Sequence, residues 1–201
     1  MNSTGKGQGR ARAGAGTLRI VGGKFRRRHL RVVARPGLRP TPDRVRETLF
    51  NWLGQDLSGL ACLDLYAGSG ALGFEAASRG AARVVLVERD RIALAALANA
   101  RAELGAAEVE IVSGDAEAYL LRSRERFDVV FLDPPFRQNV LTPLLERVQR
   151  VLSRGARVYI ESESPVAAAG WQELRRGRAG QVSYQLLQWS GDDQGGLSGN
   201  V

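Results

Sequence analysis

The sequence predicts an α/β protein built on one mostly parallel sheet, and three features of its pattern support that class. Short apolar runs alternate with helical patterns from residue 61 onward, and a glycine-rich turn follows the first run. The last two runs are separated only by a short turn. Alternating strands and helices of this length form a parallel sheet with helices on both faces. The final pair predicts an antiparallel hairpin that closes the sheet.

The predicted sheet has seven strands. An apolar run of four to eight residues between turn signals indicates a buried strand. Helices are expected after the glycine turn through Arg79 and over residues 91–104, 116–121 and 140–152. The expected strands are 61–66, 82–87, 109–112, 127–132, 156–160, 171–176 and 182–189.

Length and composition exclude several classes of protein. A chain of 201 residues forms one domain, or one domain with a short appendage. Cys62 is the only cysteine, so we expect no disulfide and a buried apolar role for this thiol. His29 is the only histidine, and a metal site is therefore not expected. The apolar runs are too short for a membrane span and the chain does not begin like a signal peptide. We expect a cytoplasmic monomer.

Positive charge is concentrated in the first quarter of the chain. Residues 1–54 hold 13 Lys and Arg against two acids, Asp43 and Glu47, which gives a net charge of +11. The remainder holds 16 Arg against 19 acids, which gives −3. A basic arm on a near-neutral body is typical of nucleic-acid binders, because Lys and Arg release counterions from phosphates. A solubilising tail is the alternative, although the excess continues into patterned sequence.

The composition divides the chain into four parts. Residues 1–16 are expected to be a disordered basic leader, and 191–201 a loose tail. Residues 17–54 are expected to form a β-ribbon and a helix that bind nucleic acid, and 55–190 the main α/β domain. The ribbon is predicted from two short strands around Gly22-Gly23 and a basic segment. Within it Phe25 could stack on a base or anchor the ribbon to the body.

A helix is predicted to begin near residue 41. Thr41 is expected to be the N-cap, with Pro42 at the first helical position. One apolar face is formed by residues with helical spacing, whereas Arg44 and Arg46 are expected to lie off that face and to be available to substrate. A solvated helix face is the ordinary alternative. The apolar residues are Val45, Leu49, Trp52 and Leu53.

A glycine-rich turn with acids near it indicates a nucleoside-binding site. Residues 68–73 carry a G-x-G-x-x-G pattern between a strand and a helix, as in nucleotide-binding folds. Glu88 ends the second strand, where it could accept hydrogen bonds from ribose hydroxyls. Asp115 follows the third strand, where it could accept from an adenine amino group. Each acid could instead be a strand-end residue or a helix N-cap.

Asp64 separates the cofactor classes. A pyrophosphate on the glycine turn would be repelled by a carboxylate four residues upstream, whereas S-adenosylmethionine brings an ammonium and a sulfonium. Three acids at successive strand ends therefore favour S-adenosylmethionine over a dinucleotide.

The segment Asp133-Pro134-Pro135-Phe136 follows the strand at 127–132. Two prolines fix the backbone and remove two donors, so the strand must end there. A carboxylate and an aromatic ring are thereby held at the carboxyl end of a strand, where α/β sheets bind ligands. A simple strand terminator is the alternative reading of this segment alone.

These motifs resemble a known family. The glycine turn and its acids, followed by Asp133-Pro134-Pro135-Phe136, resemble class I methyltransferases that act on amino groups. Residues 19–23, 38–53 and 64–70 are similar to the bacterial RsmD family, which methylates N2 of one guanine in 16S rRNA. The resemblance covers roughly residues 17–190. A departure is Arg26-Arg27-Arg28, where the family usually has a glycine between the basic residues.

The resemblance implies a Rossmann-like methyltransferase fold, S-adenosylmethionine as cofactor and the small ribosomal subunit as partner. The implied catalytic residues are Asp133, Pro134, Pro135 and Phe136. The implied cofactor-binding residues are Asp64, Tyr66, Ala67, Gly68, Ser69, Gly70, Glu88, Asp115 and Ala116. The implied RNA-binding residues are Lys24, Arg26, Arg27, Arg28, Arg31, Arg39 and Arg44.

Three other functions fit parts of the pattern. Adenine-N6 methylation uses the same tetrapeptide, but no separate domain for reading DNA is apparent. Glutamine-N5 methylation of a protein is disfavoured by the basic arm and by Asp133 in place of Asn. A catalytically silent RNA-binding or assembly factor would have no physical need for Asp64 or for the intact tetrapeptide.

Overall fold

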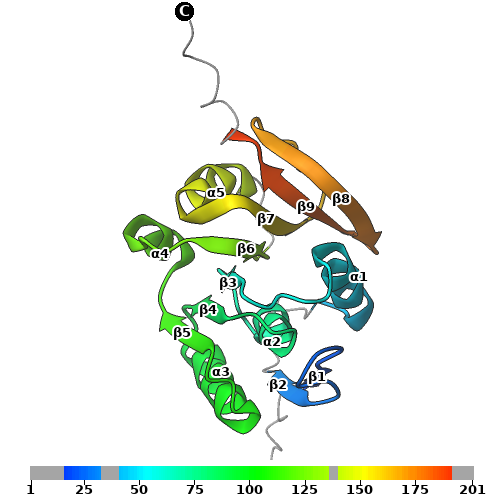
Figure 1. The fold of residues 1–201 in the computed structure, drawn as a ribbon, viewed down its shortest axis with the longest axis vertical. Helices are drawn as coiled ribbons and strands as arrows, with labels where there is room; N and C mark the ends of the chain where they lie inside the picture. Colours follow the sequence, from blue (N-terminus) through cyan, green and yellow to red (C-terminus); the bar gives the residue numbers. More distant parts are fainter. Residues whose placement is uncertain (1–15, 33–40, 136–139, 192–201) are drawn as a thin grey trace, which may run out of the picture.

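The computed structural model describes residues 16–32, 41–135 and 140–191. Their main feature is a seven-stranded sheet of order β5-β4-β3-β6-β7-β9-β8, shown in Figure 1. Within this sheet β3, β4, β5, β6 and β7 are parallel, and β9 lies antiparallel between β7 and β8. The predicted sheet and its closing hairpin are confirmed. The strands are β3 (Ala61–Asp64), β4 (Arg83–Glu88), β5 (Val109–Ser113), β6 (Phe127–Leu132), β7 (Leu152–Ser162), β8 (Trp171–Ala179) and β9 (Val182–Trp189).

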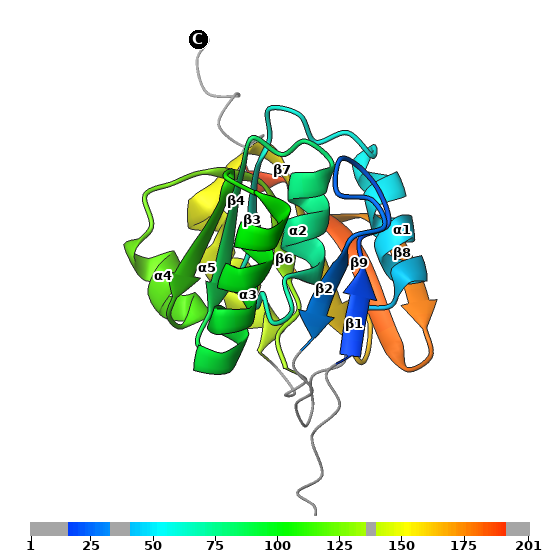
Figure 2. The same cartoon turned by 90° about the horizontal axis from the view of Figure 1, so that it is seen from below.

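Helices cover both faces of this sheet, as Figure 2 shows from a second direction. Side chains alternate across each strand, so that Val84 and Leu86 of β4 face one core and Val85 and Val87 face the other. The first core includes side chains from α1, α2 and α3, and the second includes side chains from α4 and α5. None of the described helices has the length and apolar composition needed to cross a membrane. The helices are α1 (Asp43–Leu53), α2 (Ala71–Ser78), α3 (Arg91–Leu104), α4 (Ala116–Arg122) and α5 (Leu141–Val148).

The boundary between α5 and β7 differs from the prediction. A helix was expected through residue 152, but α5 ends at Val148, a 3-10 turn covers Gln149–Val151, and β7 begins at Leu152. Its pairing with β6 shifts register between Phe127 and Val129. Gly155 has a φ of 72°, a conformation that favours glycine, and it lets the strand bulge and then resume.

The N-terminal ribbon consists of β1 (Gly16–Arg19) and β2 (His29–Val32), paired antiparallel. Gly16 thus begins a strand, although it was expected to end the leader; residues 1–15 and 192–201 lie outside the described part. The ribbon shares the first hydrophobic core, to which it contributes Leu18, Ile20 and Phe25. Phe25 is only 8% exposed, so in this structure its ring anchors the ribbon.

The start of α1 also departs from the prediction. Pro42 rather than Thr41 is the N-cap, and no side chain caps the helix. The hydroxyl of Thr41 donates instead to Oε1 of Glu161 at 2.9 Å. This contact joins residues 120 positions apart, and local pattern rules cannot predict it.

Candidate active site

The candidate site lies at the carboxyl ends of the parallel strands. The chain runs from β3 outward through β4 and β5, then returns to place β6 on the other side of β3 (Figure 1). Ligands of open α/β sheets bind where the strand order reverses in this way. Asp64 ends β3 opposite Phe131 of β6, and Asp133 follows β6 directly. The structure therefore places these two predicted residues on neighbouring strand ends at the reversal point.

The predicted glycine turn joins β3 to α2. Gly68 and Gly70 have φ angles of 51° and 77°, a conformation that L side chains rarely adopt. A Cβ atom added at Gly70 would lie 2.5 Å from Cδ2 of Phe74. At Gly73 the same atom would lie 2.1 Å from Cδ2 of Leu86, so this glycine permits close packing of helix and strand. Tyr66, Ala67 and Ser69 complete the turn around Gly68.

Asp64 is 2% exposed and lies beside this turn. Burial raises the pKa of its carboxyl to about 7, and the charge of Glu88 adds to that rise. Backbone hydrogen bonds from Tyr66 and Gly73 act in the opposite direction. No Lys or Arg forms an ion pair with Asp64 within the described ranges. A bound cation would therefore favour the ionised form of this carboxyl.

Glu88 has a local role that the sequence did not predict. Its Oε2 accepts from the backbone N–H of Gly68 at 2.8 Å, and its Oε1 accepts from those of Arg89 and Asp90 at 2.9 and 2.8 Å. The carboxylate thus ties the end of β4 to the glycine turn. Each oxygen has two lone pairs, so Oε1 is fully used by these two bonds, whereas Oε2 keeps one lone pair for a bond from a ligand.

Asp115 is the N-cap of α4, one of the two alternatives that the sequence left open. Its Oδ1 accepts from the N–H groups of Glu117 and Ala118 at 2.9 and 3.2 Å. Ala116 is buried at the start of the helix. Burial raises the pKa of the Tyr66 phenol to about 12, and the charge of the nearby Asp115 is the next largest cause. The structure therefore brings the third predicted acid to the same edge as the glycine turn.

The Asp-Pro-Pro segment follows β6 as predicted. Asp133 is partly buried, Pro134 is buried and Pro135 is exposed. Burial raises the pKa of the Asp133 carboxyl well above its usual range, and the charges of Glu161 and Asp64 raise it further. Phe136 lies outside the described residues.

Sequence reasoning missed Glu161, which belongs to the same edge. Leu132 pairs with Ile160 in the β6–β7 register, so the next residues, Asp133 and Glu161, follow side by side on the two strands. Glu161 is 6% exposed, and its Oε1 accepts from the hydroxyls of Thr41 and Tyr159, each at 2.9 Å. An acid closing an apolar strand next to the Asp-Pro-Pro strand was the signal that could have identified it.

Arg46 was expected to be available to substrate, and this prediction is wrong because the side chain is fully buried. Its Nη1 donates to Oε2 of Glu75 at 3.1 Å, and its Nη2 donates to Oδ1 of Asp43 and to the Arg19 carbonyl. Glu75 also pairs with Arg79 and accepts from the N–H groups of residues 21 and 22. Arg46 therefore fastens the ribbon and α1 to α2 and is not available to a ligand.

The predicted RNA-binding cations fall into two separate groups. Lys24 pairs with Glu108 before β5 at 2.7 Å, and Arg28 donates to the Glu103 carbonyl near the end of α3 at 2.8 Å. The ribbon turn, with Arg26 and Arg27 exposed, thus lies at the amino ends of the parallel strands (Figure 2). Asp133 follows the carboxyl end of β6, which is the opposite end.

The second group lies nearer the candidate site. Arg44 is exposed on the first turn of α1, next to the Thr41–Glu161 contact. Arg31 is exposed on β2, toward the open end of the ribbon. Arg39 lies outside the described residues.

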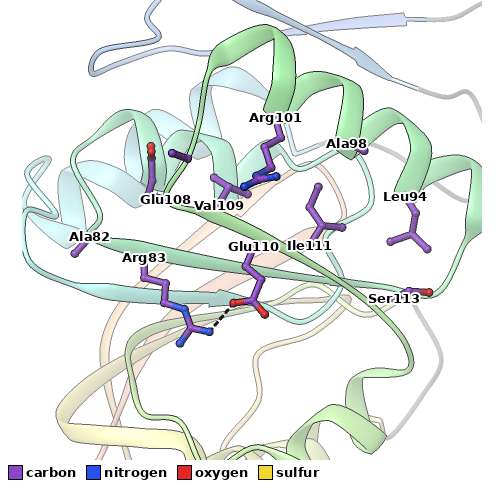
Figure 3. Close-up of a pocket in the computed structure, with 11 residues that line it drawn as sticks. Ala82, Arg83, Leu94, Ala98, Arg101, Glu108, Val109, Glu110, Ile111 and Ser113 are labelled. Atoms are coloured by element: carbon purple, nitrogen blue, oxygen red, sulfur yellow. Dashed lines mark hydrogen bonds and ion pairs between the residues drawn. The ribbon is translucent and has the colours of Figure 1, made fainter.

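A surface pocket along the edge strand β5 is lined by none of the described residues that the sequence predicted for the site. Figure 3 shows it between α3 and the edge strand β5, with Leu94, Ala98 and Ile111 on one side and the Arg83–Glu110 ion pair on the other.

Comparisons with known proteins agree with this geometry. The family model described as conserved hypothetical protein 95 matches residues 18–188. A relative in Escherichia coli K12 named ribosomal RNA small subunit methyltransferase D is 43% identical over 182 residues, which span 88% of this chain and 92% of the relative. A solved Escherichia coli structure described as a methyltransferase, yhhF, is 44% identical with a TM-score of 0.78, covering 87% of this chain and 98% of that one.

A more distant structure supports the fold alone. It is an RNA methyltransferase from Salinibacter ruber in complex with S-adenosylhomocysteine, 22% identical with a TM-score of 0.61, covering 76% of this chain and 95% of that one. The Rossmann-like methyltransferase fold expected from the motifs is thus confirmed. With a family model that spans most of its length, the chain belongs to the conserved hypothetical protein 95 family, the RsmD family of methyltransferases.

Proposed function

We propose that this protein transfers a methyl group from S-adenosylmethionine to the exocyclic N2 amine of a guanine in 16S rRNA. The observation that carries the proposal is Asp133, a carboxyl held after β6 by two prolines, beside the glycine turn of β3. Membership of a methyltransferase family supports the reaction class, and the name of the Escherichia coli relative supports the small ribosomal subunit as partner.

The residues of the glycine turn fit S-adenosylmethionine, which supplies an electrophilic methyl group on a sulfonium. Asp64 is a buried carboxyl with a raised pKa and no described cationic partner, so an ammonium or sulfonium there would stabilise its charge. The remaining lone pair on Oε2 of Glu88 would accept from a ribose hydroxyl, and Asp115 would accept from the adenine amine. Tyr66, Ala67, Gly68, Ser69, Gly70 and Ala116 would form the walls of the site.

Asp133 and the carbonyl of Pro134 would orient the target amine. The lone pair of guanine N2 is delocalised into the ring, which makes the amine a poor nucleophile. Two hydrogen bonds accepted from its N–H groups would rehybridise it and direct the lone pair at the methyl carbon. Phe136 and Pro135 would hold the extruded base by stacking and apolar contact. This is orientation and electrostatic stabilisation, without a covalent enzyme intermediate.

The separation of the cations divides their proposed roles. Arg44 and Arg31 would contact phosphates next to the flipped guanine, because α1 begins beside Glu161 and Arg31 lies toward the open end of the ribbon. Arg39, which the sequence predicts for the same role, would join them. Lys24, Arg26, Arg27 and Arg28 would contact a part of the subunit farther from the target base. A ribosomal substrate places the proposed activity in the cytoplasm. All the residues named above come from one chain, so a monomer is sufficient.

Two alternatives remain as outcomes of a direct test. Adenine-N6 methylation would use the same Asp-Pro-Pro geometry, and a silent assembly factor would bind RNA without turnover. We would incubate the protein with methyl-labelled S-adenosylmethionine and 30S subunits that lack the modification, then digest the 16S rRNA and identify the labelled nucleoside by mass spectrometry. N2-methylguanosine is expected. N6-methyladenosine would assign the first alternative, and no labelled nucleoside would assign the second.

The roles of the two cation groups should be tested with single charge variants. Deleting the ribbon would also remove side chains of the first hydrophobic core. Arg44→Ser is expected to weaken turnover with 30S subunits, whereas Arg26→Ser should leave kcat unchanged and reduce only the salt dependence of binding, by about 0.7–0.9 per phosphate contact. The reverse pattern would show that the ribbon turn faces the target.

A further inference from the structure

Glu161 is a buried carboxyl at the candidate site for which the proposed mechanism has no role. It lies at the end of β7, the strand next to β6, and follows Ile160, whose register partner Leu132 precedes Asp133 (Figure 1). Two hydroxyls hold its Oε1, from Thr41 before α1 and from Tyr159 on the same strand. Two independent elements thus position an acid beside the residue that would orient the target amine.

We propose that Glu161 is a positioning residue of the methyl transfer, whose carboxylate acts through Asp133 by making it a better hydrogen-bond and proton acceptor. The inference rests on the proposed function, because it assigns a partner to the proposed catalytic carboxyl.

The charges around Asp133 are consistent with this role. Glu161 on β7 and Asp64 on β3 both face it and raise its pKa, in addition to burial. The phenols of Tyr159 and, across the β7–β9 pairing, Tyr184 also lie near Glu161. No Lys or Arg of the described residues is paired with either carboxyl. A carboxyl with only anionic and neutral neighbours holds a proton more tightly than a solvated one. Burial raises the pKa of Glu161 as well, whereas the hydrogen bonds from Thr41 and Tyr159 lower it and favour the charged form that acts on Asp133.

The proton balance of the reaction gives this property a use. The N2 lone pair forms the new N–C bond while the C–S bond breaks, and the electron pair of that bond remains on sulfur. The methylated nitrogen then carries a positive charge and loses one proton. Asp133, made more basic by Glu161, accepts that proton along the hydrogen bond that oriented the amine, and releases it to solvent when the product leaves.

A purely structural role for Glu161 predicts a different result. In that case the residue would only fasten Thr41, and with it the start of α1, to β7. Glutamine keeps the oxygen that accepts from Thr41 and Tyr159 and removes only the charge. Glu161→Gln therefore separates the two roles, and Glu163→Gln is a matched control, because Glu163 is an exposed acid two residues later.

The test is the pH dependence of kcat with 30S subunits at saturating S-adenosylmethionine. In Glu161→Gln the acidic limb of the profile should move to lower pH by about one unit or more, because a like charge near Asp133 is removed. S-adenosylmethionine affinity should stay within about twofold. Glu163→Gln should leave the limb in place. An acidic limb that is the same in Glu161→Gln and the parent protein would overturn the inference.

A second measurement keeps the inference testable if the variant folds poorly. In the parent protein, the side-chain carboxyl carbons of Asp133 and Glu161 should each report two titration steps, as expected of a coupled pair. Independent single-step titrations would overturn the inference. A product other than N2-methylguanosine would instead overturn the proposed function, and the pair could still be tested on the nucleoside that is formed.

Discussion

Buried acids lie in two places in this fold, and they differ in whether a cation is paired with them. Glu75 in α2 is fully buried and pairs with the guanidinium groups of Arg46 and Arg79. Asp64 and Glu161 at the carboxyl ends of the strands are almost as buried, but within the described part of the chain no Lys or Arg pairs with them.

The difference indicates which acids maintain the fold and which are reserved for a ligand. A buried carboxylate that is already paired with cations is stabilised by them, and its oxygens are not available to a substrate. A buried carboxyl without them is costly to ionise, and it becomes useful when a cation or a proton donor arrives. Glu75 thus joins the ribbon and α1 to α2. The acids at the strand ends have no such pairing, and we propose that they act on the sulfonium and the target amine.

Removing the charge of Glu75 should have the largest effect, because it turns the compensated cluster into an uncompensated one. Glu75→Gln removes the only fully buried carboxylate that Arg46 and Arg79 share, which leaves Arg46 with the half-exposed Asp43 alone, and should lower the free energy of unfolding by about 3–5 kcal/mol. Urea denaturation followed by circular dichroism measures this change. Glu103→Gln, an exposed acid on α3, should change it by less than about 0.5 kcal/mol. A loss as small as that of the control would show that the cluster is not a structural anchor.

Asp133→Ala tests the acids at the strand ends, which have no described cationic partner. Loss of one transition-state hydrogen bond should reduce the single-turnover rate about a hundred- to a thousand-fold, with the unfolding curve and cofactor affinity unchanged. Asp133→Asn should retain partial activity, because its amide oxygen still accepts a hydrogen bond. A parent-like rate in Asp133→Ala would remove the catalytic assignment, and an equal loss in both variants would point to the charge rather than the hydrogen bond.

Cofactor affinity should depend on pH through Asp64. Its pKa of about 7 means that most molecules of the free protein hold a proton on this carboxyl at pH 6. Cation binding favours the ionised form, so affinity should rise about five- to tenfold from pH 6 to pH 7.5, with release of a proton. Calorimetry in two buffers of different ionisation enthalpy measures both. Asp64→Asn should bind weakly at every pH; if it keeps the slope of the parent, another group is responsible.

The smallest expected effect concerns the ribbon that Glu75 holds in place. Arg27 has a φ of 70°, which is unfavourable for a residue with a side chain. Arg27→Gly should raise the free energy of unfolding by about 1 kcal/mol through relief of this strain. Arg26→Gly, where φ is not positive, is the control and should not be stabilising.

Much of the fold could be predicted because it follows from local pattern. The bounds of α3 and β6 are as expected, since an N-cap aspartate, a glycine C-cap and a Pro-Pro stop are encoded at their ends. The start of β7 was missed, because a bulge at Gly155 depends on pairing with β6.

The candidate site was predicted in part for the same reason. Asp64, Glu88, Asp115 and Asp133 each end a strand or follow one, so topology alone brings them to one edge. The contacts of Arg46 with Glu75 and of Glu161 with Thr41 were not predictable, because in each pair the two residues lie on elements far apart in sequence. Helical spacing placed Arg46 off the apolar face, but it cannot show that Glu75 of another helix lies opposite.

The most direct test of the contrast between the two clusters is a carboxyl-carbon NMR titration of Asp64, with and without S-adenosylhomocysteine and sinefungin, an amine-bearing analogue of the cofactor. We expect its pKa to be near 7 in the free protein and to fall by at least one unit when the cationic analogue binds. A pKa near 4 in the free protein, unchanged by ligand, would contradict the claim that the strand-end acids are held uncompensated for a cationic cofactor.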